Sequence, residues 1–150
     1  TIVVGEMREI ETMRTAITAA ETGHLVFTTL HSADTGGAIE RFVAVFPEGE
    51  QDSIRQQLSL VLRGVFAQRL LPAKAVGKSR VVCNELLLVT PAVSNLIATG
   101  KSRQITSMMQ TGRANGMITF EDSINQLYSS GKISLETLNS VTLNARVANG

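Results

Sequence analysis

The sequence predicts an α/β fold in which a β-α-β unit and a β-hairpin are followed by a small part made of short helices. Apolar, mostly β-branched runs at residues 2–4 and 25–30 flank a segment with helical spacing, as expected for two parallel strands joined by a helix. Two more strand-like runs, 68–71 and 80–89, surround a turn region. After residue 90 the pattern changes to short apolar stripes, which are typical of short helices.

Composition limits the class of protein. A chain of 150 residues, 43% hydrophobic and 18% charged, has room for one ordinary globular domain, with or without a small appendage. The net charge of +1 provides no basic field for nucleic acid, and no apolar run approaches the roughly 18–20 residues of a membrane span. The lone Cys83 excludes an intramolecular disulfide, so we expect a reducing compartment. Because a core strand opens the chain without a preceding signal peptide, we expect the chain to be part of a longer protein.

The first strand is predicted to carry a carboxylate at its carboxyl end. The run Ile2-Val3-Val4 leads into Gly5-Glu6, a pattern typical of a fully buried parallel strand. A helix is expected over residues 9–21, and the second strand, Leu25–Leu30, leads into His31. Because ligands bind at the carboxyl ends of strands in open α/β sheets, we expect Glu6 and His31 side by side in a site. The buried side of the helix is expected to carry Ile10, Met13, Ile17 and Ala20.

Two helices are expected after a polar, glycine-rich loop at residues 31–37. Asp34 or Thr35 is placed to cap the first helix, which ends before Pro47. The second helix is expected from Glu50 to Val65. Their apolar stripes are Ile39, Phe42, Val43 and Phe46 in the first helix, and Ile54, Leu58, Val61, Leu62 and Val65 in the second.

The hairpin formed by strands 68–71 and 80–89, with its turn at residues 72–78, is expected at the edge of the first sheet. The helices beyond it need not share a core with the sheet, so we place a boundary near Pro91, between parts at 1–90 and 91–150. Four short helices are expected, starting at Thr90 and near Ile105, Thr119 and Ser134. Their inward residues are Val93, Leu96 and Ile97; Ile105, Met108 and Met109; Ile124, Leu127 and Tyr128; and Leu135, Leu138 and Val141.

Glu6 and His31 each allow two interpretations. A carboxylate at the end of a strand can hold Mg²⁺, directly or through water, or polarise an attacking water; it can also simply pair with Arg8 or cap the next helix. An imidazole on the following loop can contact a γ-phosphate, or it can be a structural loop histidine. His24 lies at the start of the second strand. With about 3.3 Å of rise per residue, His24 and His31 cannot share one metal ion, so we reject a zinc site.

Two tripeptides imitate a phosphate-binding loop. Gly77-Lys78-Ser79 and Gly100-Lys101-Ser102 lack the glycine that the GxxxxGK[ST] pattern requires five residues earlier, where Pro72 and Asn95 stand. Neither tripeptide is expected to follow a strand into a helix. The sequence therefore contains only half of a nucleotide site.

Two segments together resemble the type II/type IV secretion ATPases. Ile2–Arg8 resembles the Walker B signature of that superfamily, with Glu9 where the family usually has aspartate. Ala20–His31 resembles its histidine box, and both His24 and His31 match the box histidines. The resemblance covers essentially the whole chain.

Several further segments resemble the pilus-retraction subfamily in particular: Val65–Leu71, Met109–Gly116 and Met117–Thr119. Ala92–Gly100 aligns with a retraction-ATPase helix motif in which Ser94 and Ala98 replace two arginines. Assembly and secretion ATPases typically carry a tetracysteine zinc insertion near this region, so a single cysteine favours the retraction subfamily.

The resemblance implies a fold, cofactors and site residues. Residues 1–90 would form part of a RecA-like P-loop NTPase core, and residues 91–150 a helical subdomain. ATP and Mg²⁺ would be the cofactors, with Glu6, His31 and His24 catalytic, and Glu6, Arg8 and His31 binding the nucleotide. Glu6 would hold Mg²⁺, directly or through water, jointly with residues outside this sequence. Because the family's phosphate-binding loop and aspartate-box glutamate are missing, we expect the chain alone not to hydrolyse ATP.

The resemblance also implies partners and a location. The parent protein would be a hexameric motor that couples ATP hydrolysis to type IV pilus retraction in twitching motility. It would lie in the cytoplasm, peripherally associated with the inner membrane, and contact an inner-membrane pilus platform protein. Changes in the γ-phosphate contacts of Glu6 and His31 on hydrolysis would rotate the subunits.

Other functions stay open. The parent could be a pilus-assembly or type II secretion ATPase of the same superfamily, or the chain could be a non-enzymatic oligomerisation or interaction module. A dinucleotide-binding domain has little support, because the turn at Gly5 lacks the G-x-G-x-x-G pattern.

Overall fold

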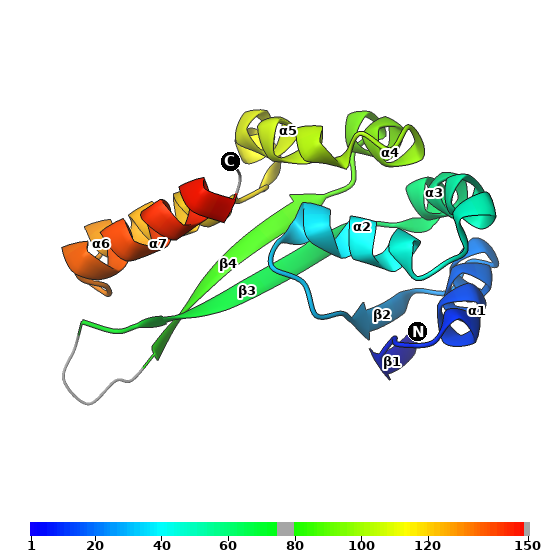
Figure 1. The fold of residues 1–150 in the computed structure, drawn as a ribbon, viewed down its shortest axis with the longest axis horizontal. Helices are drawn as coiled ribbons and strands as arrows, with labels where there is room; N and C mark the ends of the chain where they lie inside the picture. Colours follow the sequence, from blue (N-terminus) through cyan, green and yellow to red (C-terminus); the bar gives the residue numbers. More distant parts are fainter. Residues whose placement is uncertain (75–79, 149–150) are drawn as a thin grey trace.

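The computed structural model describes residues 1–74 and 80–148, and side chains as far as residue 142. The chain starts with β1 (Ile2–Glu6), α1 (Ile10–Glu21) and β2 (Val26–Thr29) (Figure 1). The two strands pair in parallel, with Ile2 opposite Val26 and Glu6 opposite Thr29, and the register shifts between Val4 and Glu6. The predicted β-α-β unit is confirmed, and both strands end at the same edge of the sheet.

The expectation that the first strand is fully buried was wrong. Val3 is 76% exposed on β1 and Phe27 is 55% exposed on β2. Only the opposite face of this two-stranded sheet, which carries Val4 and Val26, packs against the hydrophobic core. An apolar run indicates that both faces of a strand can be buried. Whether they are buried depends on whether other elements cover each face of the sheet.

Helices α2 (Thr35–Ala44) and α3 (Glu48–Val61) follow β2. The predicted cap is confirmed, because the Asp34 carboxylate accepts a hydrogen bond from the Gly37 amide at 2.7 Å. Arg55 of α3 donates two hydrogen bonds to Glu40 of α2, at 2.8 and 2.7 Å, and joins the two helices. The predicted apolar stripe of α2, comprising Ile39, Phe42, Val43 and Phe46, is buried.

The predicted end of the second helix was wrong. Helix α3 stops at Val61, Leu62 already has extended backbone angles, and Val65 lies in a strand. Val65 lies four and three residues after Val61 and Leu62, which is helical spacing. Pairing with a distant strand decides the conformation at Val65, and local periodicity does not contain that information.

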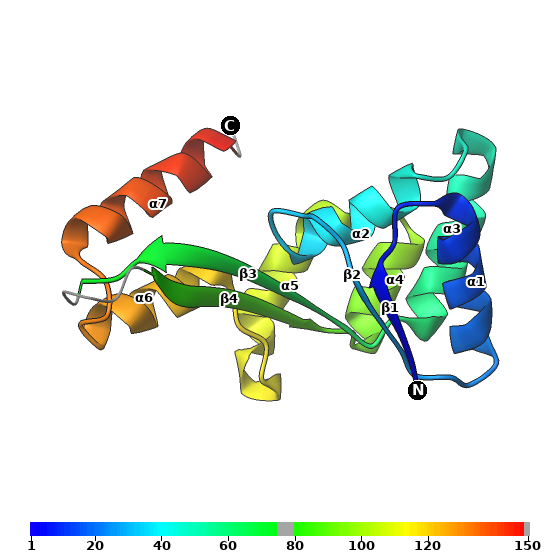
Figure 2. The same ribbon diagram turned by 90° about the horizontal axis from the view of Figure 1, so that it is seen from below.

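The hairpin consists of β3 (Gly64–Pro72) and β4 (Arg80–Leu88), antiparallel from Gly64 opposite Leu88 to Pro72 opposite Arg80. It was expected at the edge of the first sheet, and that was wrong: within the described ranges it forms a second, separate two-stranded sheet. Figure 2 shows the long hairpin running from the region of β1 and β2 toward α6 (Phe120–Ser129) and α7 (Leu135–Ala148). Most of the expected turn, and the tripeptide Gly77-Lys78-Ser79, lie outside the described residues.

The C-terminal part is helical, as predicted. Thr90 and Thr119 cap their helices, and Thr119 with Asp122 forms a reciprocal capping box. Ile118 exchanges two backbone hydrogen bonds with Leu86 of β4, at 2.8 and 3.0 Å, and thereby attaches the start of the third helix to the hairpin. Tyr128 and Leu135, expected to face inward, are 41% and 54% exposed. The helices are α4 (Pro91–Ala98), α5 (Ile105–Thr111), α6 (Phe120–Ser129) and α7 (Leu135–Ala148), with short 3-10 turns at Ser102–Gln104 and Gly112–Asn115.

Two hydrophobic cores support this arrangement. The first extends from Met7 to Met117 and includes buried residues of all five helices from α1 to α5 together with Leu87 of β4. The second lies between the hairpin and α6 and contains Leu71, Cys83, Phe120, Ile124 and Ile133. The first core continues across residue 91, and the division of the chain at that residue stays a prediction.

The first core allows a matched test on a single helix. Leu58 and Leu60 lie two residues apart in α3, but Leu58 is 6% exposed and Leu60 is 71% exposed. We expect Leu58→Ala to lower the free energy of unfolding by about 2–5 kcal/mol, because it leaves a cavity. Leu60→Ala should change the free energy by at most about 0.5 kcal/mol, as is usual at exposed positions. Urea denaturation followed by circular dichroism measures both values, and equal losses would contradict the described packing of α3.

Candidate functional site

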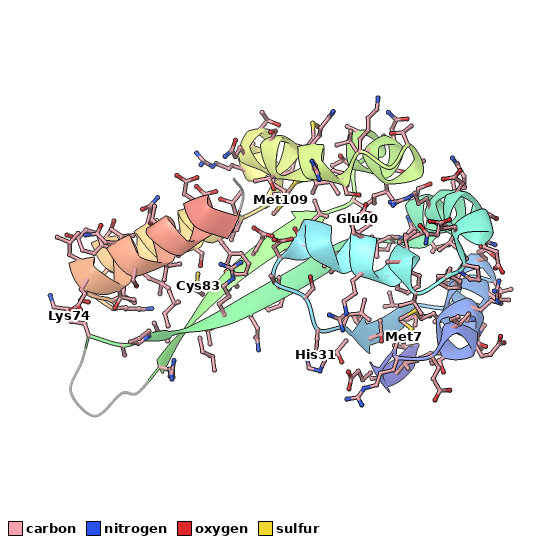
Figure 3. All side chains as sticks on the ribbon, in the orientation of Figure 1. Met7, His31, Glu40, Lys74, Cys83 and Met109 are labelled. Carbon is pink, nitrogen blue, oxygen red and sulfur yellow. The ribbon has the colours of Figure 1, made fainter. Side chains whose placement is uncertain are left out.

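The candidate site lies at the edge of the parallel sheet where β1 and β2 end. Glu6 is the last residue of β1, and β2 ends at Thr29, two residues before His31. The Thr29 hydroxyl donates to the Gly5 carbonyl across the two strands and ties their ends together. Parallel pairing therefore brings Glu6 and His31 to the same edge, as the sequence predicts. Figure 3 shows His31 beyond the end of β2.

Glu6 is the centre of a group of charged side chains. Its two carboxylate oxygens have different partners: Arg8 Nη2 lies 2.7 Å from Oε2, and His31 Nε2 lies 3.2 Å from Oε1. The side chain of Glu6 is 31% exposed, whereas those of Arg8 and His31 are 75% and 79% exposed. The structure thus brings together the three residues predicted to bind nucleotide, in an arrangement that solvent reaches.

The surroundings of Glu6 favour its charged form. The hydrogen bond from Arg8 is the main cause that lowers the pKa of Glu6 below its ordinary value of 4.5. Partial burial acts in the opposite direction, and the positive charges of Arg8, His31 and Arg41 lower the pKa further. Near neutral pH the site therefore presents an ionised carboxylate beside the guanidinium group of Arg8.

Arg41 is a site residue that the sequence analysis missed. It lies on α2, and it lines a small pocket of about 260 Å³ together with Glu6, Arg8 and His31. The apolar wall of this pocket consists of Met7, Met13, Leu30 and Val45. The spacing within α2 contains no signal for this role, because on a helical projection Arg41 lies on the face opposite the buried stripe.

His24 lies elsewhere. It precedes β2, near Ile2, at the opposite end of the sheet from Glu6. Its Nδ1 atom lies 3.1 Å from the Ala19 carbonyl oxygen and 3.2 Å from the Thr22 hydroxyl, at the end of α1. The structure therefore places His24 in local contacts that close α1, and it does not bring His24 to the group around Glu6.

The possible metal ligands at this edge suit a cation that keeps several water ligands better than one that is coordinated by protein atoms alone. Among residues 1–74 and 80–148, no three His, Cys, Asp or Glu side chains come together as a metal site. Glu6 is the one acidic residue that lines the pocket. Mg²⁺ commonly keeps several waters and takes one or two carboxylates together with substrate phosphates, and a single carboxylate fits that pattern.

No helix within the described part of the chain has both the length and the apolar character to span a bilayer.

The cationic side chains that line the pocket lie together at one end of the first sheet. Their position favours a small anionic ligand over an extended polyanion.

Comparison with known proteins identifies similar molecules. The family model described as "Type II/IV secretion system protein" matches residues 1–140. A "Twitching motility protein" from Neisseria gonorrhoeae is 47% identical over 135 residues, which are 90% of this chain and 36% of that protein. A "Type IV pilus retractation ATPase PilT" from Pseudomonas aeruginosa is 46% identical over 135 residues, which are 90% of this chain and 39% of that protein.

Among solved structures, the crystal structure of the pilus retraction motor PilT with bound ADP superposes with a TM-score of 0.80. The two are 43% identical, and the match covers 91% of this chain and 38% of that one. The match confirms the predicted α/β fold as a partial RecA-like core, and the resemblance to the secretion ATPases is confirmed as well. The chain spans less than two fifths of the length of these relatives.

The ion pair at Glu6 can be tested by titration. Replacing Arg8 with alanine removes the main cause of the lowered pKa, so the pKa of Glu6 should rise toward 4.5. Because the folded-state pKa lies below the unfolded value, the stabilisation is present above pH 4.5 and is lost as pH falls through the folded pKa. NMR titration of the side-chain carboxyl carbons measures the pKa.

The matched control is Arg14→Ala, because Arg14 pairs with Glu50 at 2.7 Å. This control should leave the pKa of Glu6 unchanged. The described pairing is incorrect if Glu6 titrates alike in the original chain and in Arg8→Ala.

Proposed function

Because the chain belongs to the Type II/IV secretion system protein family, we propose that it is part of an ATP-hydrolysing motor for type IV pilus retraction in twitching motility. One observation carries the proposal: Glu6, Arg8 and His31 meet at the carboxyl edge of a parallel sheet. Ligands commonly bind at this edge in α/β proteins. The names of the similar proteins from Neisseria and Pseudomonas, which refer to twitching motility and pilus retraction, support the same role.

We assign a role to each polar residue of the pocket. Glu6 would hold Mg²⁺, directly or through a water molecule, and Arg8 and His31 would bind the phosphates of ATP. Bound Mg²⁺ would neutralise charge that develops on the phosphates. Arg41 adds a second guanidinium at the same pocket. The lowered pKa of Glu6 supports its role as a ligand, because a magnesium ligand must be ionised at working pH.

The proposed catalytic role of His24 rests on the resemblance to the histidine box alone. Its contacts with Ala19 and Thr22 are those of a residue that closes a helix. A catalytic His24 would have to act at a second position of the assembled protein, away from Glu6.

The proposal includes an assembly and a location. The parent protein is a cytoplasmic hexamer, peripherally associated with the inner membrane, and it works on an inner-membrane pilus platform protein. Loss of the γ-phosphate contacts of Glu6 and His31 on hydrolysis would shift one subunit against the next, which is the usual mechanism of a nucleotide switch. The alternative roles are pilus assembly and type II secretion.

A non-enzymatic interaction module is the alternative from a different class. One observation favours it: Arg8 already occupies one oxygen of Glu6 and His31 the other. Nucleotide binding distinguishes the two functions directly.

We expect Mg-ATP to bind only when the phosphate-binding loop is present. Isothermal titration calorimetry on this chain, and on a version extended at its N-terminus through the expected GxxxxGK[ST] loop, makes the comparison. The extended version should bind and hydrolyse ATP, and Glu6→Gln or His31→Ala should abolish measurable turnover, because metal binding and phosphate contact are lost.

The matched control is Lys101→Ala in the extended version. Lys101 belongs to the Gly100-Lys101-Ser102 tripeptide that we rejected as a phosphate-binding loop, so turnover should persist. If neither version binds Mg-ATP, the motor function is wrong and the interaction module replaces it. Measuring His24→Ala in the same assay decides whether His24 is catalytic.

A further inference from the structure

A buried carboxylate of the hairpin has no part in the proposed nucleotide site. Glu85 lies on β4, is 6% exposed, and has no cation within salt-bridge distance among the described side chains. Its Oε1 atom accepts hydrogen bonds from the Thr35 amide at 2.9 Å and the Thr35 hydroxyl at 2.8 Å. Its Oε2 atom accepts from the Phe120 amide at 3.2 Å.

These donors belong to the starts of two helices. Thr35 is the first residue of α2, and Phe120 is the first residue of α6. The first amides of a helix have no acceptor within the helix, and the helix dipole favours a negative charge there. The Glu85 carboxylate therefore accepts a hydrogen bond from the first amide of each helix. Neither helix start can move away from it without leaving a buried amide unpaired.

Arg69 makes a second link between the same two regions. It lies on β3, and its Nε and Nη2 atoms donate to the Ala33 carbonyl oxygen at 3.2 and 2.9 Å. The guanidinium carbon lies 4.2 Å from the centre of the Phe120 ring. A planar guanidinium suits this combination, because it stacks on a ring with its face and donates with its edge.

Both links start from the loop that carries His31. Ala33 and Thr35 are two and four residues after His31, and within the loop Ser32 Oγ donates a hydrogen bond to the Asp34 carbonyl at 3.0 Å. The Thr35 hydroxyl also lies 3.5 Å from the sulfur of Met109 on α5. Figure 3 shows Met109 close to the start of α2. The His31 side chain is exposed and contacts Glu6, while its backbone belongs to this loop.

We propose that Arg69 and Glu85 are positioning residues, which hold the His31 loop in place and couple it to the start of α6. A displacement of α6 acts on the Phe120 amide and the Phe120 ring, and both are bound to residues that also hold the loop. The C-terminal helices thereby influence the position of His31 without touching it. The importance of this coupling for catalysis rests on the proposed function, whereas the coupling itself does not.

NMR spectroscopy of the imidazole groups tests the coupling in the chain as it is. The chain contains two histidines, and His24 lies at the opposite end of the sheet and serves as an internal reference. Phe120→Leu removes the ring that stacks on Arg69 but keeps the backbone amide that binds Glu85. We expect the His31 imidazole signals and the Ala33 amide signal to shift in this variant, while the His24 signals stay in place.

Two further variants separate the links. Arg69→Lys keeps the charge but loses the planar guanidinium, which stacks on Phe120 with its face and donates to Ala33 with its edge. The His31 and Ala33 signals should therefore shift in the same way as in Phe120→Leu. Glu85→Gln keeps the shape of the side chain but replaces one accepting carboxylate oxygen with an NH2 group. This NH2 group then faces a hydrogen-bond donor of Thr35 or Phe120. The variant should shift the amide signals of Thr35 and Phe120 together with those of His31.

Ile124→Val is the control for general loosening. Ile124 is buried in the second core on the same helix, and none of the hydrogen bonds described above involves it. This variant should leave the His31 signals in place. The proposal is wrong if Phe120→Leu and Arg69→Lys do not move the His31 and Ala33 signals, or if Ile124→Val moves them equally. Because no nucleotide is present, this result is independent of the ATP-binding test, and either proposal can fail without the other.

Discussion

The buried carboxylate of Glu85 links the two hydrophobic cores. One of its oxygens binds Thr35, whose hydroxyl contacts Met109 of the first core, and the other binds Phe120 of the second core. Each buried amide left without its acceptor would cost about 1–3 kcal/mol, a large share of the stability of a small domain. A single side chain on a strand thus joins the starts of two helices from distant parts of the sequence.

The site at the end of β1 is built in the opposite way, from exposed and exchangeable contacts. Arg8 and His31 are mostly solvent-accessible, and ion pairs between exposed side chains contribute little to the stability of the fold. Under the proposed function, a phosphate that arrives at the pocket would therefore take over Arg8 or His31 from Glu6 at little cost. The rigid part of the arrangement is the backbone, where parallel pairing and the Thr29 hydroxyl hold the strand ends together. Weak side-chain pairing on a rigid edge suits a group that must bind and release a nucleotide.

Local signals in the sequence predict local structure well here, and long-range pairing accounts for the errors. The caps at Asp34 and Thr119 and the stripe of α2 follow from spacing and side-chain chemistry within a few residues. The end of α3 depends on β4, more than twenty residues later, and the exposure of Val3 depends on how many layers cover the sheet. Glu85 also left a signal, because it lies two residues from both Cys83 and Leu87 and therefore on the same inward face of β4. Its partners could not be predicted, since they lie on two helices whose placement the strand pattern does not contain.

The attachment of α6 to the hairpin decides which motions can reach the His31 loop. Ile118, just before α6, is bound to Leu86 by two backbone hydrogen bonds, so this segment moves together with β4. Glu85 is the neighbour of Leu86 on that strand, and Arg69 lies on the paired strand β3. Hairpin and helix start therefore form one body, and the loop is attached to that body at Ala33 and Thr35. A force applied to the C-terminal helices passes through two side chains to the residues beside His31, while β1 and Glu6 are held by their own pairing with β2.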